Sequence, residues 1–147
     1  MDTSETCTFC NQEKVKTQIV YVDSLWRIIF ARRPLAVGHI MIMPIKHFSS
    51  FTELGLEELA TIGAIIKKAT QALEHAFQAT GVNVFANIGK AAGQSIPHLH
   101  IHIITRFDNE LTNPFHVLNT SEGTKKLLRP TKEAIDERIR ALQAFLV

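Results

Sequence analysis

Short apolar segments rich in β-branched and aromatic residues alternate with polar turns along this chain, and such segments predict strands. Asp23 and Ser24 separate the first two segments, which predicts a hairpin. Pro44 ends the third segment, whose nearly continuous apolar character is typical of a central strand. The predicted strands lie at residues 18–23, 25–31, 39–44, 82–87 and 98–106.

Two stretches instead show the three- or four-residue spacing of amphipathic helices. A Ser-x-x-Glu capping box at Ser50 and Glu53 opens the longer helix, and Thr80 with Gly81 ends it. Its apolar stripe should lie on the sheet and consists of Leu56, Leu59, Ile62, Ile66, Leu73 and Phe77. The second helix begins at Pro130 and Thr131 and has an apolar face made of Ile135, Ile139, Leu142 and Leu146.

Strands joined by short connections, with one long helix and a C-terminal helix, predict an α+β fold built on an antiparallel sheet of about five strands. Residues 107–129 are polar and predict a long loop. The 147 residues are 46% hydrophobic and 20% charged, which suits a globular chain with an ordinary core. No repeat or linker interrupts them, so we expect a single domain over 1–147.

The charge balance and the N-terminus limit the classes of partner. The formal net charge is +2, so neither a basic nucleic-acid groove nor a polybasic membrane patch is expected. The first residues are polar, unlike a secretory signal, and no apolar run approaches the roughly 18 residues of a membrane span. We therefore expect a cytoplasmic protein that recognises any anionic ligand locally.

Cys7 and Cys10 form a C-x-x-C pair, which points to metal or redox chemistry in a reducing compartment. A thioredoxin-like motif needs a preceding strand, and only six residues of polar character come before Cys7. A metal site is the better interpretation, with two unliganded thiols as the alternative.

Three histidines, His98, His100 and His102, alternate with apolar residues in the predicted strand 98–106. On a strand they share one face, while Leu99 and Ile101 point toward the core. Clustering imidazoles on one face destabilises a protein unless a metal, an anion or a hydrogen-bond network compensates. The pattern therefore predicts a functional cleft.

The loop before these histidines suggests which anion is bound. Gly89 and Gly93 allow close approach of the backbone to a ligand, and Gln94 and Ser95 add side-chain donors. Such a loop suits a phosphate group. The alternative is a plain turn built from small residues.

A neutral imidazole can attack phosphorus if one ring nitrogen is held protonated and the other is left bare. The product is a phosphoramidate intermediate on histidine. Ser95 or His102 could hand a proton to the leaving group, and no organic or redox cofactor is required.

These residues resemble the histidine triad (HIT) family of nucleotide hydrolases and transferases, whose signature is His-φ-His-φ-His-φ-φ with φ apolar. The match runs from Cys7 to about Arg106. It implies an antiparallel sheet with a long helix, assembled as a homodimer with a joined sheet. It also implies a nucleotide substrate, with adenine or another purine as the expected base.

The resemblance implies a role for each residue that matches the family signature. His100 would attack the α-phosphate, and His39 would support the histidine cluster. The residues implied around the phosphate are Asn87, Gly93, Gln94, Ser95 and His102.

A subset of the family carries structural zinc on an N-terminal C-x-x-C, which Cys7 and Cys10 resemble. The other ligands would be His47 and His98. Such a Cys₂His₂ set leaves no position for a reactive water, so the metal would clamp the segment 1–17 to the strand that carries His100.

The chain departs from many relatives in two places. Ala31 stands where an Asp or Asn binds the ribose, which leaves Arg32 and Arg33 as possible phosphate or base contacts or as solvated side chains. After the triad, residues 103–106 lack the usual Pro or Gly, and residues 107–147 form a variable C-terminal extension.

Three functions follow from these features. The main hypothesis is a hydrolase acting on dinucleoside polyphosphates or nucleoside phosphoramidates through a covalent intermediate on His100. A non-catalytic nucleotide-binding or scaffold protein is the alternative that Ala31 motivates. A catalytic metal held by all three triad histidines is disfavoured, because the ends of a His-x-His-x-His strand lie about 13 Å apart.

Overall fold

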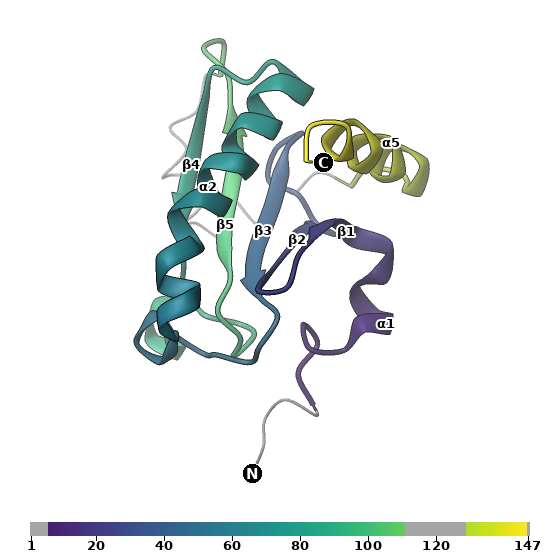
Figure 1. Ribbon diagram of the computed structural model, residues 1–147. Helices are drawn as coiled ribbons and strands as arrows, with labels where there is room; N and C mark the ends of the chain where they lie inside the picture. Colours follow the sequence, from purple (N-terminus) through teal and green to yellow (C-terminus); the bar gives the residue numbers. More distant parts are fainter. Residues whose placement is uncertain (1–5, 111–128, 147) are drawn as a thin grey trace.

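The computed structural model describes residues 6–110 and 129–146, and Figure 1 shows their arrangement. Five strands form one sheet in the order β1-β2-β3-β5-β4, and all neighbouring strands run antiparallel. Their bounds are β1 Ile19–Val22, β2 Trp26–Phe30, β3 His39–Pro44, β4 Gly81–Phe85 and β5 Ile101–Arg106. The predicted α+β class and antiparallel sheet are confirmed.

Two helices cover one face of the sheet (Figure 1). These are α2 (Leu56–Phe77) and α5 (Lys132–Gln143), and α5 packs on β1 and α2. Alternation along the strands directs Ile28, Ile40 and Ile103 into this main core, where they lie fully buried. No helix in the part of the chain that the structure describes is long and apolar enough to cross a membrane.

The N-terminal segment covers the opposite face of the sheet with a second, smaller core. Its short helices, α1 (Gln12–Val15) and η1 (Lys16–Gln18), were not predicted from the sequence. Cys7, Phe9 and Val15 pack there against Ile29 of β2 and Met43 of β3. The triad histidines lie on this second face, opposite the helices.

The long helix differs from its predicted form at its beginning. Ser50 makes no capping bond; Glu53 instead accepts from the backbone N–H and the hydroxyl of Ser49, at 2.7 and 2.6 Å. That arrangement closes the short turn η2 (Phe51–Glu53), and α2 starts later with Gly55 as its N-cap. Leu56 and Leu59 are 86% and 51% exposed, so the predicted stripe is wrong in its first turn.

The remaining boundaries differ by a few residues from the prediction. β4 is shifted to Gly81–Phe85, and β5 begins at Ile101, after two of the three triad histidines. The terminal helix is confirmed, since the hydroxyl of Thr131 caps it by accepting from the N–H of Ala134, 3.3 Å away. Most of the predicted 107–129 loop lies outside the described residues.

Candidate active site and metal centre

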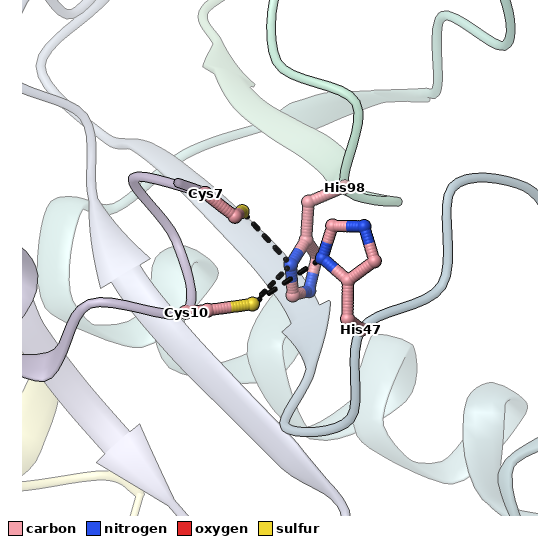
Figure 2. Close-up of side chains that lie close together, drawn as sticks. All are labelled: Cys7, Cys10, His47 and His98. Carbon is pink, nitrogen blue, oxygen red and sulfur yellow. Dashed lines mark hydrogen bonds between the residues drawn. The ribbon is translucent and has the colours of Figure 1, made fainter. Parts of the chain in front are cut away.

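Four predicted metal ligands meet at one end of the sheet (Figure 2). Cys7 and Cys10 come from the N-terminal segment, His47 from the loop after β3 and His98 from the segment before β5. Their ligand atoms all lie within 4.8 Å of one another. The backbone N–H of Leu99 donates to the carbonyl of Phe48 (2.6 Å) and so ties the last two segments together.

The spacing of these atoms fits a tetrahedral metal ion. Cys7 Sγ and Cys10 Sγ each lie 3.5 Å from His98 Nδ1, and Cys10 Sγ lies 3.3 Å from His47 Nδ1. Bonds of about 2.3 Å to sulfur and about 2.0 Å to nitrogen would place such atoms about 3.5 Å apart. Cys7, Cys10, His47 and His98 could therefore hold a metal ion.

Hydrogen bonds fix which nitrogen of His98 is bare. Its Nε2 lies 2.9 Å from the carbonyl oxygen of Pro44, which can only accept, so Nε2 carries the proton. Its Nδ1 is left bare and faces the two sulfur atoms. That is the form a metal ligand requires.

The same reasoning applies to His100. Its Nδ1 lies 2.7 Å from the carbonyl oxygen of His98 and donates to it. The proton is therefore on Nδ1, and Nε2 carries a free electron pair. This is the state that the sequence required of a nucleophile.

His39 and His102 form a directed pair. The backbone N–H of Leu35 donates to Nδ1 of His39 over 3.1 Å, so neutral His39 carries its proton on Nε2. That Nε2 lies 3.0 Å from Nδ1 of His102 and donates to it. His102 in turn carries its proton on Nε2, where it can donate to a ligand.

Burial keeps this cluster uncharged near neutral pH. It lowers the pKa of His39 to about 4, with the charge of His100 acting in the same direction. Burial and the neighbouring His39 and His100 lower the pKa of His102 to about 3. Burial also lowers the pKa of His98, to about 4, and that of His100.

Aromatic rings surround the histidines. Phe85 of β4, paired with His102 across the sheet, stacks on its ring with centroids 4.8 Å apart. The ring of Phe9 meets His100 edge-on at 5.2 Å and His98 at 6.0 Å. The sequence analysis did not identify Phe9, or Arg27, which donates to the backbone carbonyl of Phe9. The position of Arg27 inside an otherwise apolar strand could have indicated its role.

The glycine loop holds its own shape. Gly89 and Gly93 adopt positive φ angles of 80° and 84°, which glycine accepts readily. The Gln94 amide accepts from the N–H of Gly89 (2.8 Å) and donates to the carbonyl of Ser49 (2.9 Å). The N–H groups of Ala92, Gly93 and Gln94 also donate within the loop. The phosphate contacts of Asn87, Gly93, Gln94 and Ser95 stay predictions.

The departures from the family pattern have structural counterparts. Ala31 is buried, and its N–H donates to the carbonyl of His39 (2.9 Å). Arg32 donates to Oε1 of Gln18 (2.8 Å) and to the carbonyl of Lys14 (2.6 Å). These bonds hold Arg32 against the N-terminal segment.

The similarity of this chain to known proteins shows its family. The HIT domain model matches residues 12–109, two thirds of the chain and all five strands. The chain belongs to the HIT domain family.

Two HIT structures extend the similarity over almost the whole chain. A Zn-bound histidine triad family protein from Mycobacterium smegmatis is 25% identical, with a TM-score of 0.78, and the match covers 97% of this chain and 94% of that one. A hypothetical histidine triad nucleotide-binding protein from Sulfolobus tokodaii is 27% identical, with a TM-score of 0.77 and coverage of 95% and 91%.

A relative from Schizosaccharomyces pombe carries the name bis(5'-nucleosyl)-tetraphosphatase [asymmetrical]. It is 30% identical over 63% of this chain, and the match spans half of that protein's length. The relatives of this HIT protein thus include a dinucleotide hydrolase.

Proposed function

We propose that this protein is a nucleotide hydrolase in which His100 attacks the α-phosphate of a nucleotide. The observation that carries the proposal is the bare Nε2 of His100, held in that form by the bond from its Nδ1 to the carbonyl of His98. The name of the tetraphosphatase relative supports a dinucleoside polyphosphate as the substrate class, with nucleoside phosphoramidates as the second class.

The reaction proceeds in two displacements. In the first, the bond between Nε2 of His100 and phosphorus forms as the bond to the leaving group breaks. From a dinucleoside polyphosphate, the leaving group is the remaining nucleoside polyphosphate, which departs as an anion and needs no proton. The ring of His100 becomes positively charged, and the carbonyl oxygen of His98 stabilises it through the bond from Nδ1–H. In the second, water attacks phosphorus and loses a proton to solvent, the nitrogen–phosphorus bond breaks, His100 returns to its neutral form, and a nucleoside monophosphate leaves.

His102 and Ser95 assist on the leaving-group side. The Nε2–H of His102 donates to a phosphoryl oxygen and stabilises its growing charge, because His39 fixes the direction of that donor. A leaving amine also needs a proton, which Ser95 or His102 would hand on from solvent. We also propose that Asn87, Gly93 and Gln94 line the phosphate site.

We propose zinc as the metal and a structural role for it. Cysteine sulfur and imidazole nitrogen in a four-ligand set are typical of structural zinc, and the Mycobacterium smegmatis HIT protein is Zn-bound. All four positions are taken by Cys7, Cys10, His47 and His98, so the ion stabilises the fold and activates no water. Metal-bound cysteines also suit a reducing compartment, in keeping with a cytoplasmic protein.

We further propose that two copies pair through β4. This strand lies at one edge of the sheet, and Val84 on it is 44% exposed. Leu56 and Leu59 at the start of α2 are also exposed. An antiparallel pair of β4 strands would join the two sheets, satisfy the open edge and cover these apolar side chains.

A non-catalytic nucleotide-binding protein is the second candidate function. The observation that favours it is buried Ala31, whose methyl group cannot bind the ribose hydroxyls. In that case the site would bind a nucleotide without splitting it.

The deciding experiment compares the protein with His100→Asn on an adenosine phosphoramidate and several dinucleoside polyphosphates. We expect nucleoside monophosphate release by the wild type and none by His100→Asn, which should still bind nucleotide by calorimetry. The exposed His75, changed to Asn, is the matched control and should keep full activity. Binding without release by the wild type would favour the second candidate.

A further inference from the structure

Arg27 is a buried cation that the proposed chemistry does not use. It lies on β2 between buried apolar residues and is 5% exposed. Its Nη1 donates to the carbonyl of Phe9 (2.9 Å), and its Nε is buried without a partner. Among the described residues, no carboxylate forms an ion pair with it. A buried guanidinium is costly unless something nearby compensates.

The carbonyl that Arg27 holds lies inside the metal-binding loop. Phe9 stands between Cys7 and Cys10, so fixing its backbone fixes the spacing of the two sulfur atoms. When a divalent ion is bound, its charge balances the two thiolates, so the link between Arg27 and the metal site is the hydrogen bond to the Phe9 carbonyl.

The side chain of Phe9 continues the contact toward the nucleophile. Its ring meets His98 and His100 edge-on, with interplanar angles of 83° and 75°. The ring occupies one side of the His100 imidazole, and the carbonyl of His98 fixes its Nδ1. Rotation of His100 would break both contacts.

We infer that Arg27 is a positioning residue that holds the Cys7–Cys10 loop in place, and that the loop orients His100 through the ring of Phe9. Two contacts then join the metal-binding residues to His100: the ring of Phe9 packs against its imidazole, and the carbonyl of His98 accepts from its Nδ1. The activity readout of this inference rests on the proposed hydrolase function and the metal readout on the proposed zinc site, whereas the NMR readout rests on neither.

The first test measures metal retention. Arg27→Met keeps the apolar stem and removes the donor, and Arg27→Lys keeps the charge without the planar fork. Each protein, loaded with about one zinc ion per chain, is mixed with a colorimetric chelator. We expect Arg27→Met to lose zinc about 10- to 100-fold faster than the wild type, as for other partners that orient ligands. Arg27→Lys should restore part of the difference.

Arg140→Met is the matched control, because Arg140 is exposed on α5. It should lose zinc at the wild-type rate. Equal rates for Arg27→Met and the wild type would overturn the role of Arg27 at the loop.

The second test observes His100 directly. Nitrogen NMR of the histidine rings distinguishes protonated from bare ring nitrogens without any turnover. We expect a single tautomer for His100 in the wild type, and exchange-broadened signals in Arg27→Met and in Phe9→Leu. Phe9→Leu keeps the carbonyl that Arg27 binds, so it should retain zinc like the wild type while losing order at His100.

Kinetics separate positioning from substrate binding. In Phe9→Leu we expect kcat to fall by about tenfold with KM changed far less, because a misaligned nucleophile slows the chemical step. If no nucleotide is cleaved by the wild type, the proposed function fails while the zinc and NMR measurements still decide this inference. If Arg27→Met does not fold, Arg27→Lys decides the role of Arg27, and zinc loss at the wild-type rate in that variant would overturn it. Wild-type His100 signals in Phe9→Leu would overturn the link from the loop to His100.

Discussion

A backbone amide sets the direction of the hydrogen bonds between His39 and His102. The N–H of Leu35 cannot accept, so His39 must donate from its other nitrogen. His102 consequently presents its own N–H to the ligand side. The direction of these hydrogen bonds is therefore set by the position of the backbone N–H of Leu35 and not by the pKa values of the two histidines.

Replacing His39 with Leu tests this polarity. The variant lacks the donor to Nδ1 of His102, which could then adopt either tautomer. Losing a buried hydrogen bond of about 1–3 kcal/mol should slow turnover by about 5- to 150-fold. The measurement is kcat on the preferred substrate, with folding checked by circular dichroism. Unchanged kcat would mean that His102 is held by something other than His39.

The same pair predicts how stability depends on pH. The pKa of His39 falls from 6.5 to about 4 on folding and that of His102 to about 3. Between these values and pH 6.5 the unfolded chain binds more protons, so the free energy of unfolding rises with pH and levels off above 6.5. Each histidine contributes a slope of up to about 1.4 kcal/mol per pH unit.

Urea denaturation between pH 4.5 and 7.5, a range of about three units that covers most of this window, measures the slope. His39→Leu removes one titrating group, so its curve should be shallower than that of the wild type. Because the two proteins differ only at residue 39, the difference between their curves reports on the pair of His39 and His102. A parallel curve for the variant would contradict the lowered pKa of His39.

At the scale of elements, the sequence predicts the strands and helices well, but it predicts less well which of their residues pack against one another. All five strands and both main helices follow from apolar spacing. Leu56 and Leu59 fit the helical period but face away from the sheet, because a period defines a stripe and not what covers it. The capping box is displaced because Glu53 accepts from Ser49 rather than closing on Ser50.

The candidate site divides in the same way. The histidine row could be predicted from its alternation with apolar residues, and the C-x-x-C pair indicated a metal. His47 and His98 as partners of that pair followed only from the family resemblance. Arg27 and Phe9 could not be predicted, since their contacts join segments whose approach depends on the whole fold. The tautomers depend on single carbonyl and amide groups, which no side-chain pattern reveals.

Close packing between the turn before β3 and the main core gives an element-scale prediction. A Cβ on Gly38 would lie 2.5 Å from Cγ2 of Thr105 and 2.8 Å from the ring of Phe77. Gly38→Ala should therefore lower the free energy of unfolding by about 1–3 kcal/mol in urea titration.

Gly63 provides the control for that substitution. It lies within α2, and a Cβ there meets nothing within 4 Å. Gly63→Ala should raise the free energy of unfolding by about 0.5–1 kcal/mol. Equal effects at the two positions would show that the contacts around Gly38 relax without cost.

For the whole molecule, pairing of two copies through β4 predicts that a charged side chain near this edge strand converts the dimer to a monomer. Leu59→Asp or Val84→Asp would bring like charges together across a two-fold contact. We expect sedimentation velocity to show a dimer for the wild type and a monomer for either variant. Val22→Asp, on the exposed part of β1 at the other edge, should leave the dimer intact. A wild-type monomer would refute the joined sheet.

The four residues that could hold a metal are also widely separated along the chain. Cys7 and His98 lie 91 positions apart, so a bound ion closes a loop of that length. Such a cross-link removes more freedom from the unfolded chain than a short one does. His98 is also the last of the four ligands to be synthesised. Binding by all four residues therefore has to wait until β1 to β4 have been synthesised, and it can precede the synthesis of β5 and α5.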